Sequence, residues 1–407
     1  MSHSANAARA PAPKPKPKPK PKPKPKPKPK PSVLFRADAS AAVGLGHVGR
    51  CLALAQALQA QGARCGLVVR EPSPLLLQRC QALGLDCLAL QPTDQASGAA
   101  ETLWPPALQR QDAALSLAAW RGLRLASGPD WIVVDHYGLD AHWHDALREA
   151  AGPAGPRLAA IDDIANRRLA VDLLIDHNHA SDHRAKYQAC LPTGAAMCAG
   201  PSHALLGPVY ADAAPHRPGP EVRSIGVFMG GADQAGLSAV ALQAVTLAGF
   251  HGPVQIASTS TNPHLASLAQ AVALRAQTDL LLDQPDLSRF FARHDLQIGA
   301  GGGATWERCC LGAPTLAVAV AANQRAVLEP LASLGVMVLA RHDPHHAQAL
   351  ADSLQPLLAD AALRRRLSQS ARSLVDGRGA QRVAQAMLAT AAARRLISDP
   401  FFPVNPA

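Results

Sequence analysis

The sequence predicts an α/β protein made of two Rossmann-like domains, with mostly parallel sheets that face each other across a cleft. Apolar, strand-like runs alternate with Ala- and Leu-rich helical segments from Ser32 onward. A stretch rich in proline (Ala213–Pro220) interrupts this alternation near its middle, as a linker would. Each half also has a glycine-rich loop between a strand and a helix, at Val43–Arg50 and at Ile298–Glu307.

The first 31 residues differ in composition from everything that follows. Pro13–Pro31 is a strict Pro-Lys alternation, which favours an extended, solvated polyproline II segment over any packed structure. Ten of the forty basic residues lie in this tail, so thirty basic residues face thirty acidic ones in the remainder. The net charge of +10 is therefore no sign of nucleic-acid binding by the folded part. The tail is either a low-complexity expansion or a tether to an acidic partner or anionic surface.

Cysteine usage and hydropathy indicate a cytoplasmic protein. The eight cysteines form no Cys-x-x-Cys pair, and several lie in apolar runs, as expected for small buried side chains in a reducing compartment. No apolar run reaches the roughly 18–20 residues of a membrane span, and no apolar signal region precedes the Pro-Lys repeats. We expect a disordered tail over 1–31, domains over 32–212 and 221–396, the linker 213–220, and a C-terminal tail over 397–407.

The first domain is predicted from apolar runs that end in polar residues and from the helical segments between them. Its strands are expected at Val33–Arg36, Cys65–Val69, Cys87–Leu90, Trp131–Asp135, Leu158–Asp162 and Leu173–Asp176. Its helices are expected near His47–Gln61, at Pro74–Ala82, around Ala113–Trp120 and at His142–Ala150. Open parallel sheets bind ligands at the carboxyl ends of their strands, so the polar residues that follow these runs are candidate site residues.

The second domain repeats the pattern. Strands are expected at Ile225–Phe228, Val254–Ala257, Asp279–Leu282, Leu296–Gly299, Thr315–Val320 and Val336–Leu339. A long helical region at Ala347–Val375, broken near Ala359–Asp360, and a terminal helix at Gln381–Leu396 close the chain.

The first glycine loop places a titratable side chain where a ligand can approach the backbone. His47 lies at the start of the following helix, and an imidazole there can exchange a proton near neutral pH. The spacing Gly44-x-Gly46-x-x-Gly49 also matches a dinucleotide fingerprint, which would indicate a nicotinamide or flavin enzyme. However, the first glycine of that fingerprint ends the strand, whereas here residues 36–43 intervene.

The second glycine loop is suited to an oxyanion. Gly301, Gly302 and Gly303 allow backbone N–H groups to converge at a helix N-terminus, where a diphosphate would be stabilised without a metal. Glu307 follows about one turn into the helix. Its carboxylate either accepts hydrogen bonds from a pair of sugar hydroxyls or interacts favourably with the helix dipole.

Other polar residues have a structural and a functional interpretation. His142 and His144, or His177 and His179, could hold a metal together with Asp135, Asp162 and Asp163, but sixteen histidines make chance pairs common. Arg36 and Asp38 could pair with each other, and Tyr137 could be a packing residue. No metal and no cofactor are expected.

Several motifs in both halves, in the same order, resemble one family. They cover about Val33 to Leu396 and include the segments 36–40, 44–47, 50–52, 135–140, 161–163, 205–210, 228–233, 299–302, 306–312 and 323–324. This set is similar to the PseG family of UDP-2,4-diacetamido-2,4,6-trideoxy-β-L-altropyranose hydrolases, which act in pseudaminic acid biosynthesis for flagellin glycosylation. Gly303-Ala304 replaces a common serine or threonine, and Ala322 replaces a frequent acid.

The resemblance implies a GT-B fold and metal-independent hydrolysis that releases UDP and the free sugar. By this likeness His47 is the general base and water attacks the anomeric carbon. The sugar would contact Tyr137 and Asn323, and Glu307 would hold the uridine ribose. The diphosphate would lie on two glycine pairs, Gly230-Gly231 and Gly301-Gly302. Gly46, Arg36 and Asp38 complete the expected substrate-binding set.

Two rival functions fit the same residues. A GT-B glycosyltransferase would use a UDP-sugar donor and an acceptor hydroxyl in place of water. A non-catalytic nucleotide-sugar-binding protein would depend on its Pro-Lys tail for recruitment.

Overall fold

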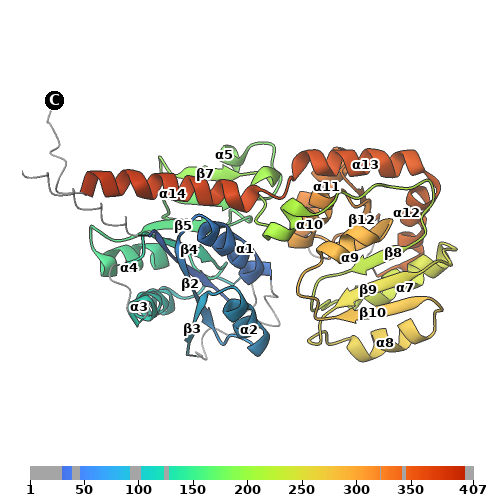
Figure 1. The fold of residues 1–407 in the computed structure, drawn as a ribbon, viewed down its shortest axis with the longest axis horizontal. Coiled ribbons are helices and arrows are strands. Elements are labelled where there is room, and N and C mark those ends of the chain that lie inside the picture. Colours follow the sequence, from blue (N-terminus) through green and yellow to red (C-terminus); the bar gives the residue numbers. More distant parts are fainter. Residues whose placement is uncertain are drawn as a thin grey trace, which may run out of the picture. The chain divides into compact units, whose positions relative to one another are not determined.

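The computed structural model describes residues 30–38, 46–91, 102–122, 128–320, 322–341 and 345–398, without the side chains of 322–323 and 390–398. Within these ranges the predicted α/β architecture is confirmed, with two sheets whose strands are paired in parallel (Figure 1). Residues 1–29 of the Pro-Lys tail, the residues after 398 and Gly44 of the first glycine loop lie outside the described residues.

The first sheet has seven strands in the order β3-β2-β1-β4-β5-β6-β7. Val, Ile and Leu dominate its central strands because both of their faces are covered. The strands are β1 (Ser32–Ala37), β2 (Arg64–Arg70), β3 (Asp86–Leu90), β4 (Trp131–Asp135), β5 (Arg157–Ile161), β6 (Leu173–Asp176) and β7 (Ala196–Ala199). β7 is absent from the sequence prediction, because its short run Ala-Met-Cys-Ala has little β-propensity and pairs only through β6.

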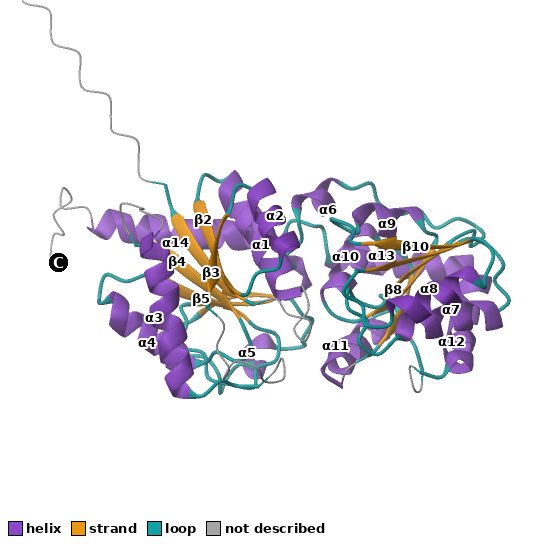
Figure 2. Cartoon of the chain, turned by 90° about the horizontal axis from the view of Figure 1, so that it is seen from below, coloured by secondary structure: helices purple, strands orange, loops and turns teal. Residues whose placement is uncertain are grey.

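Alternate residues of each strand face opposite helical layers. Val33 and Phe35 of β1 pack beneath α1 (Gly46–Ala60) and α2 (Pro74–Ala82), whereas Leu34 belongs to the core under α3 (Pro106–Gly122) and α4 (Ala141–Ala151). Figure 2 shows this sheet between its two layers of helices. Three short helices complete this part of the chain: α5 (His183–Lys186), η2 (Pro201–His203) and α6 (Pro208–Asp212).

The second sheet has six strands in the order β10-β9-β8-β11-β12-β13, the same arrangement as the first six strands of the first sheet. They are β8 (Ile225–Phe228), β9 (Val254–Ser258), β10 (Thr278–Leu282), β11 (Leu296–Ala300), β12 (Thr315–Val318) and β13 (Val338–Leu339). One face packs on α7 (Leu237–Leu247), α8 (Leu265–Ala273) and α12 (Ala347–Ala359). The other packs on α9 (Ser288–Arg293), α10 (Gly303–Leu311), α11 (Ala322–Ser333) and α13 (Ala361–Leu374).

The break predicted near Ala359–Asp360 is present and has a local cause. The Asp360 carboxylate accepts a hydrogen bond from the backbone N–H of Leu363 at 2.9 Å, so this residue ends α12 and caps α13.

The chain does not divide between its two sheets at one point. The sequence assigns residues up to 212 to the first domain, yet Leu206 and Tyr210 pack into the core of the second sheet. Likewise, α14 (Gly379–Ser398) follows the second sheet in sequence, but Val383 and Met387 are buried in the core of the first. We call each sheet with the helices that cover it a lobe. Figure 1 shows α14 (red) along the first lobe, where it contacts α1.

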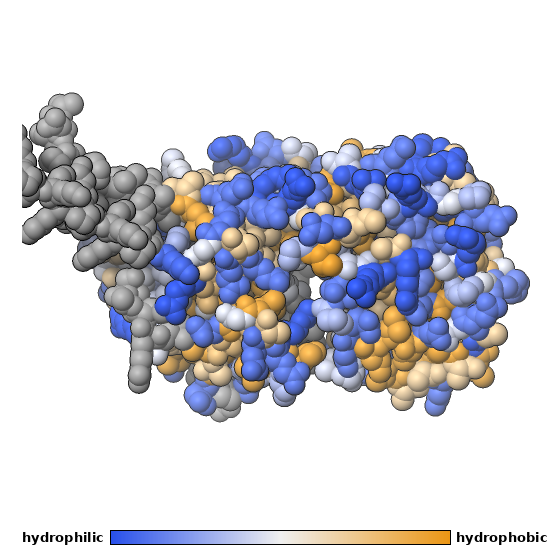
Figure 3. Space-filling view, in the orientation of Figure 1, coloured by the Kyte–Doolittle hydropathy of each residue, from blue (hydrophilic) through white to orange (hydrophobic). Residues whose placement is uncertain are grey.

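The surface is mixed in character. Hydrophilic and apolar residues are interspersed over the face in Figure 3, with an apolar area over α8. Leu274, which follows α8, is 90% exposed. Of the described helices, none has both the length and the apolar character that a bilayer crossing demands.

We expect α14 to stabilise the first lobe although it is encoded after the second. Met387 is fully buried, and its backbone carbonyl accepts a hydrogen bond from the indole N–H of Trp131 at 3.0 Å. Met387→Ala should lower the free energy of unfolding by about 2–5 kcal/mol in denaturant titrations, because the cavity cannot fully collapse. Leu247→Ala on the exposed side of α7 should change it by less than about 0.5 kcal/mol. Equal effects of both changes would contradict this packing.

Candidate active site

Both sheets change direction at the same place in their strand order. The chain adds strands outward from β1 in one direction and then returns to β4 on its other side, and β8 and β11 repeat this in the second sheet. Ligands of open α/β sheets bind beyond the carboxyl ends of the strands at such a switch point. His47 follows β1, and Tyr137 follows β4. Gly230-Gly231 and Gly301-Gly302 follow β8 and β11. The sequence-predicted residues therefore lie at the two switch points.

His47 is held by a buried carboxylate that sequence reasoning considered only as a metal ligand. Nδ1 of His47 lies 2.5 Å from Oδ1 of Asp135, the last residue of β4. An ionised carboxylate can only accept, so Nδ1 carries the proton and Nε2 presents its lone pair. The His47 residue is 8% exposed, and its ring meets Tyr137 edge-on with centroids 4.6 Å apart. The arrangement can accept a proton at Nε2, as in other His–carboxylate pairs.

Arg50 joins this pair to a second carboxylate. One turn after His47 on α1, its guanidinium donates to both oxygens of Asp135, at 2.5 and 2.8 Å. It also donates to Asp163 at 3.3 Å, and the Tyr137 hydroxyl donates to the same carboxylate at 2.6 Å. Tyr137 is thus positioned by Asp163 beside the imidazole.

The charges of this cluster keep both carboxylates ionised despite their burial. Burial by itself would raise the pKa of Asp135, but the charge of Arg50 and the hydrogen bonds donated by His47 and Arg50 outweigh it and hold the pKa well below its usual range. The pKa of Asp163 is lowered in the same way, chiefly by Arg50 against burial. Burial raises the pKa of Tyr137, so its hydroxyl stays a donor at neutral pH.

His177 follows β6 at the same edge of the sheet. Burial lowers the pKa of this imidazole to about 4, and its Nδ1 is buried with no hydrogen-bond partner among the described residues. Its ring also lies edge-on to Trp306 of α10, with centroids 6.1 Å apart. Next to it, Lys186 donates to Asp176 at 2.7 Å, and Asn178 donates to Asp163 at 3.3 Å.

Arg36 and Asp38 lie in a separate, internal ion cluster. The Arg36 guanidinium is fully buried and donates to Asp38 at 2.5 and 3.0 Å and to Asp112 of α3 at 2.8 and 3.0 Å. Arg70 reaches the same two acids, through its backbone N–H to Asp38 and its guanidinium to Asp112 at 2.6 Å. All three guanidinium nitrogens of Arg36 thus donate hydrogen bonds within the protein. Its direct contact with a substrate stays a prediction.

His136 connects that cluster to the strand that carries Asp135. Its Nδ1 accepts from the Gly138 N–H at 2.9 Å, so Nε2 carries the proton and faces Asp38 at 3.2 Å. Burial lowers the pKa of His136, and the imidazole is neutral in this setting. The cluster thereby joins β1, β2, β4 and α3 immediately beside His47.

The glycine loop after β8 leaves little room for side chains. Gly230 has a positive φ of 94°, which only glycine adopts freely. A β-carbon at Gly231 would lie 3.1 Å from the Thr259 methyl group, and the Gly231 carbonyl accepts from the Thr259 hydroxyl at 2.8 Å. Asp233 caps α7 by accepting from the N–H groups of Leu237 and Ser238, both at 2.9 Å.

The loop after β11 ends at a helix N-terminus that lacks a side-chain cap. Gly302, with φ 97°, is the N-cap of α10 and has no side chain to cap the helix, although its carbonyl accepts from the Thr305 N–H at 3.0 Å. A β-carbon at Gly301 would lie 2.8 Å from the Gln324 amide oxygen of α11. The N–H groups of Gly303 and Ala304, which precede that bond, are suited to an anion. Asn323 lies in the first turn of α11, and its side chain is outside the described residues.

Glu307 lies in the middle of α10 and is partly buried. Burial raises its pKa to about 7, although the neighbouring Tyr210 hydroxyl and the Arg308 charge oppose the rise. The carboxyl group therefore titrates near neutral pH. Gly46, the first residue of α1, is exposed directly before His47.

The histidine pairs considered as metal ligands are separated by their surroundings. His144 is fully buried with neither ring nitrogen bonded, whereas His142 is exposed and bonds Asp140 at 3.0 Å. Over the described part of the chain, no group of three or more potential metal ligands occurs.

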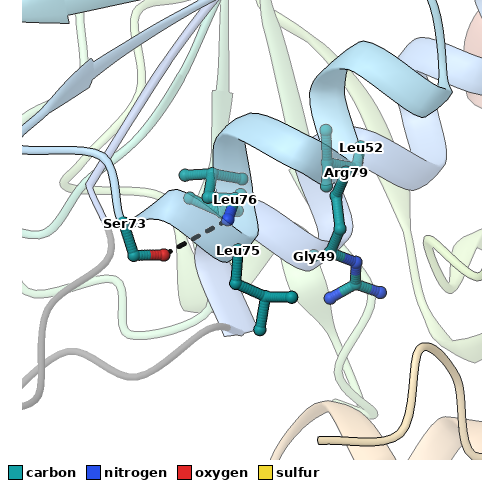
Figure 4. A pocket seen from close by; sticks show the side chains of 7 residues that line it. Gly49, Leu52, Ser73, Leu75, Leu76 and Arg79 are labelled. Carbon is teal, nitrogen blue, oxygen red and sulfur yellow. Dashed lines mark hydrogen bonds between the residues drawn. The ribbon is translucent and has the colours of Figure 1, made fainter.

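A pocket lies between α1 and α2 and does not include His47 in its lining. Figure 4 shows its lining from the starts of α1 and α2, where Ser73 caps α2 by accepting from the Leu76 N–H at 3.2 Å. The lining is mostly aliphatic, with one guanidinium: Val48, Gly49, Leu52, Ser73, Leu75, Leu76 and Arg79.

Comparison with known proteins shows the fold. No family model and no curated protein matches the chain. MurG from Acinetobacter baumannii is 15% identical and superposes over 88% of this chain and 100% of that one, with a TM-score of 0.58. The MnaA–UDP complex from S. aureus is 12% identical over 93% and 100%, with a TM-score of 0.60. A UDP-glucosyltransferase from Polygonum tinctorium is 14% identical over 88% and 99%, also with a TM-score of 0.60. The predicted GT-B-like fold is confirmed.

We expect the internal ion cluster to be essential for stability. Asp112→Asn would leave Arg36 and Arg70 with a single carboxylate inside the lobe, so the free energy of unfolding should fall by about 3–5 kcal/mol. Glu329→Gln removes a carboxylate from an exposed pair with Arg325 on α11 and should cost less than about 1 kcal/mol. Denaturant titration of both variants measures the difference. A loss below about 1 kcal/mol for Asp112→Asn would show that the cluster contributes little.

Proposed function

We propose that this protein cleaves the bond between the anomeric carbon and the diphosphate of a UDP-linked sugar. His47 is the base that activates the incoming nucleophile. The observation that carries the proposal is the His47–Asp135 pair at 2.5 Å, which leaves Nε2 as the proton acceptor at the first switch point. The GT-B-like fold supports it, since the neighbours named above include a UDP complex and a UDP-glucosyltransferase.

The reaction needs one proton transfer and one bond exchange at carbon. Water attacks the anomeric carbon and transfers a proton to Nε2 of His47, while the bond to the diphosphate oxygen breaks and UDP leaves with its electron pair. Asp135 stabilises the imidazolium that forms, and Arg50 keeps Asp135 ionised. General-base assistance of this kind contributes about 10²–10⁴ in rate. Tyr137, fixed by Asp163, would orient the sugar.

The second lobe would hold the nucleotide. The diphosphate would lie on the Gly301–Gly303 and Gly230-Gly231 loops, where backbone N–H groups at the start of α10 would neutralise it. The Glu307 carboxylate would accept hydrogen bonds from the ribose hydroxyls. Among hydrolytic substrates, the resemblance of the sequence favours a UDP-linked diacetamido-trideoxy sugar of pseudaminic acid biosynthesis.

Transfer to an acceptor hydroxyl is the second candidate, and the fold comparisons favour it at least as strongly. The same base would deprotonate the acceptor in place of water, so the site geometry is compatible with both. Incubating the protein with UDP-sugars alone separates them. UDP and free sugar formed without an acceptor indicate hydrolysis, whereas UDP that forms only after an acceptor is added indicates transfer.

In either reaction, His47→Ala should lower kcat by about 10²–10⁴, because the base is lost while the nucleotide contacts remain. Asp135→Asn should also reduce kcat, since the carboxylate that fixes the imidazole is neutralised. His251→Ala, an exposed histidine in the turn between α7 and β9, is the matched control and should keep wild-type activity. UDP release followed by phosphorus NMR measures all three. Wild-type kcat in His47→Ala would refute the assignment of the base. A wild type that releases no UDP, with or without an acceptor, would leave a binding protein as the remaining hypothesis.

Uridine affinity should depend on the ionisation of Glu307. The pKa of this carboxyl is raised to about 7, and the carboxylate is the form that accepts two hydroxyl hydrogen bonds. Uridine should bind roughly tenfold more tightly at pH 8 than at pH 6, because the ionised fraction rises over that interval. Calorimetry with uridine, which lacks phosphate, isolates this effect, and Glu307→Gln should bind weakly with no change over the interval. Affinity that falls with rising pH in the wild type would exclude this role.

A further inference from the structure

Arg308 is a buried cation with unused hydrogen-bond donors and, within the described ranges, no close ion pair. It lies on α10, its residue is 1% exposed, and one guanidinium nitrogen donates to the Ala300 carbonyl at 2.8 Å. Its Nε and Nη1 are buried and have no hydrogen-bond partner in the described part of the chain. No carboxylate of the described residues forms an ion pair with it. Burying a charge is costly unless it is paired and fully hydrogen-bonded. This guanidinium is therefore buried without the full compensation that it needs.

The other buried arginines do not share this feature. Arg36 contacts two carboxylates, and Arg70, whose Nε is also buried without a partner among the described residues, forms an ion pair with Asp112. Arg364 forms no ion pair in the described part of the protein, but its guanidinium donates four hydrogen bonds to backbone carbonyls, at 2.7 to 3.1 Å. Of these four buried arginines, Arg308 alone has unused donors and no ion pair with a described carboxylate.

The guanidinium lies directly under the second glycine loop. A β-carbon on Gly299 would be 2.5 Å from its Nη1, so the close approach requires glycine at that position. The Phe291 ring lies on its other side, with the guanidinium carbon 5.7 Å from the ring centroid. The same loop leads into the uncapped N-terminus of α10 at Gly302. A full positive charge and a helix N-terminus thus act on one loop.

We propose that Arg308 is the buried counter-charge of the diphosphate bound at Gly301–Gly303. This inference rests on the proposed function. Arg308 is a positioning residue, because it acts from beneath the loop through its charge and its hydrogen bond to Ala300. In the low-dielectric interior such a charge is screened far less than a surface lysine, so it favours a bound dianion strongly.

The test compares two ligands that differ only in the diphosphate. Calorimetry is done at about pH 8.5, where the Glu307 carboxyl, with its pKa of about 7, is ionised, because the Arg308 charge also acts on this group. Arg308→Met should weaken UDP binding by about tenfold there, whereas uridine affinity should change by less than about twofold, since the lost charge then acts mainly on the diphosphate. Arg308→Lys keeps the charge and should keep the wild-type ratio of UDP to uridine affinity within about threefold. Arg364→Met, the matched control, should leave that ratio unchanged.

Several outcomes would overturn the inference. A wild type that binds UDP, with an Arg308→Met variant that loses neither ligand or both equally, refutes the role of Arg308 and leaves the proposed function intact. A wild type that binds neither UDP nor uridine refutes the proposed function itself, and this inference with it. If Arg308→Met does not fold, nitrogen-15 NMR of the wild type decides. The Arg308 Nε–H signal, assigned by its loss in Arg308→Lys, must shift with UDP and stay in place with uridine.

Discussion

The carboxylate of Asp135 is charged and buried at the same time, and the first lobe provides the hydrogen-bond donors that stabilise it. Its residue is at the end of β4, in the middle of a seven-stranded sheet, where water has no access. The guanidinium of Arg50 and the imidazole of His47 chiefly offset the loss of hydration. His47 and Arg50 both lie in the first turns of α1. Their contacts with Asp135 therefore fix the position of the start of that helix. The orientation of His47 is a consequence of this pairing.

A second set of charges supports the first from the neighbouring strands. The Arg36–Asp38–Asp112–Arg70 cluster balances two guanidinium groups against two carboxylates. Neutral His136, which directly follows Asp135 in the chain, contacts this cluster through Asp38. Parallel strands bring their carboxyl ends to one edge, and the polar residues that follow them are therefore gathered there. The cations of β1, β2 and α1 keep those carboxylates from repelling one another.

The second lobe has the same strand order but a different chemistry at its edge. Its loops after β8 and β11 are rich in glycine, and a β-carbon at Gly231 or Gly301 would crowd the side chain of Thr259 or Gln324. The buried guanidinium of Arg308 lies beneath the loop after β11, and two of its nitrogens have no hydrogen-bond partner among the described residues. On the proposed function, one lobe would supply the base and the other the site for the anion. The two lobes are also linked covalently and by packing, because α14 leaves the second and completes the core of the first.

The fold class could be predicted from sequence because alternating apolar runs and helical segments encode parallel α/β sheets directly. The positions of His47, Tyr137 and both glycine loops at strand ends followed from the same pattern. The partners of these residues could not be predicted, because Asp135 lies 88 residues from His47 and Asp112 lies 76 residues from Arg36. Their pairing depends on β1 lying beside β4, and the placement of α14 depends on which apolar surface remained uncovered. Local periodicity determines the elements, whereas the burial of specific charges is decided only when distant strands and helices are packed together.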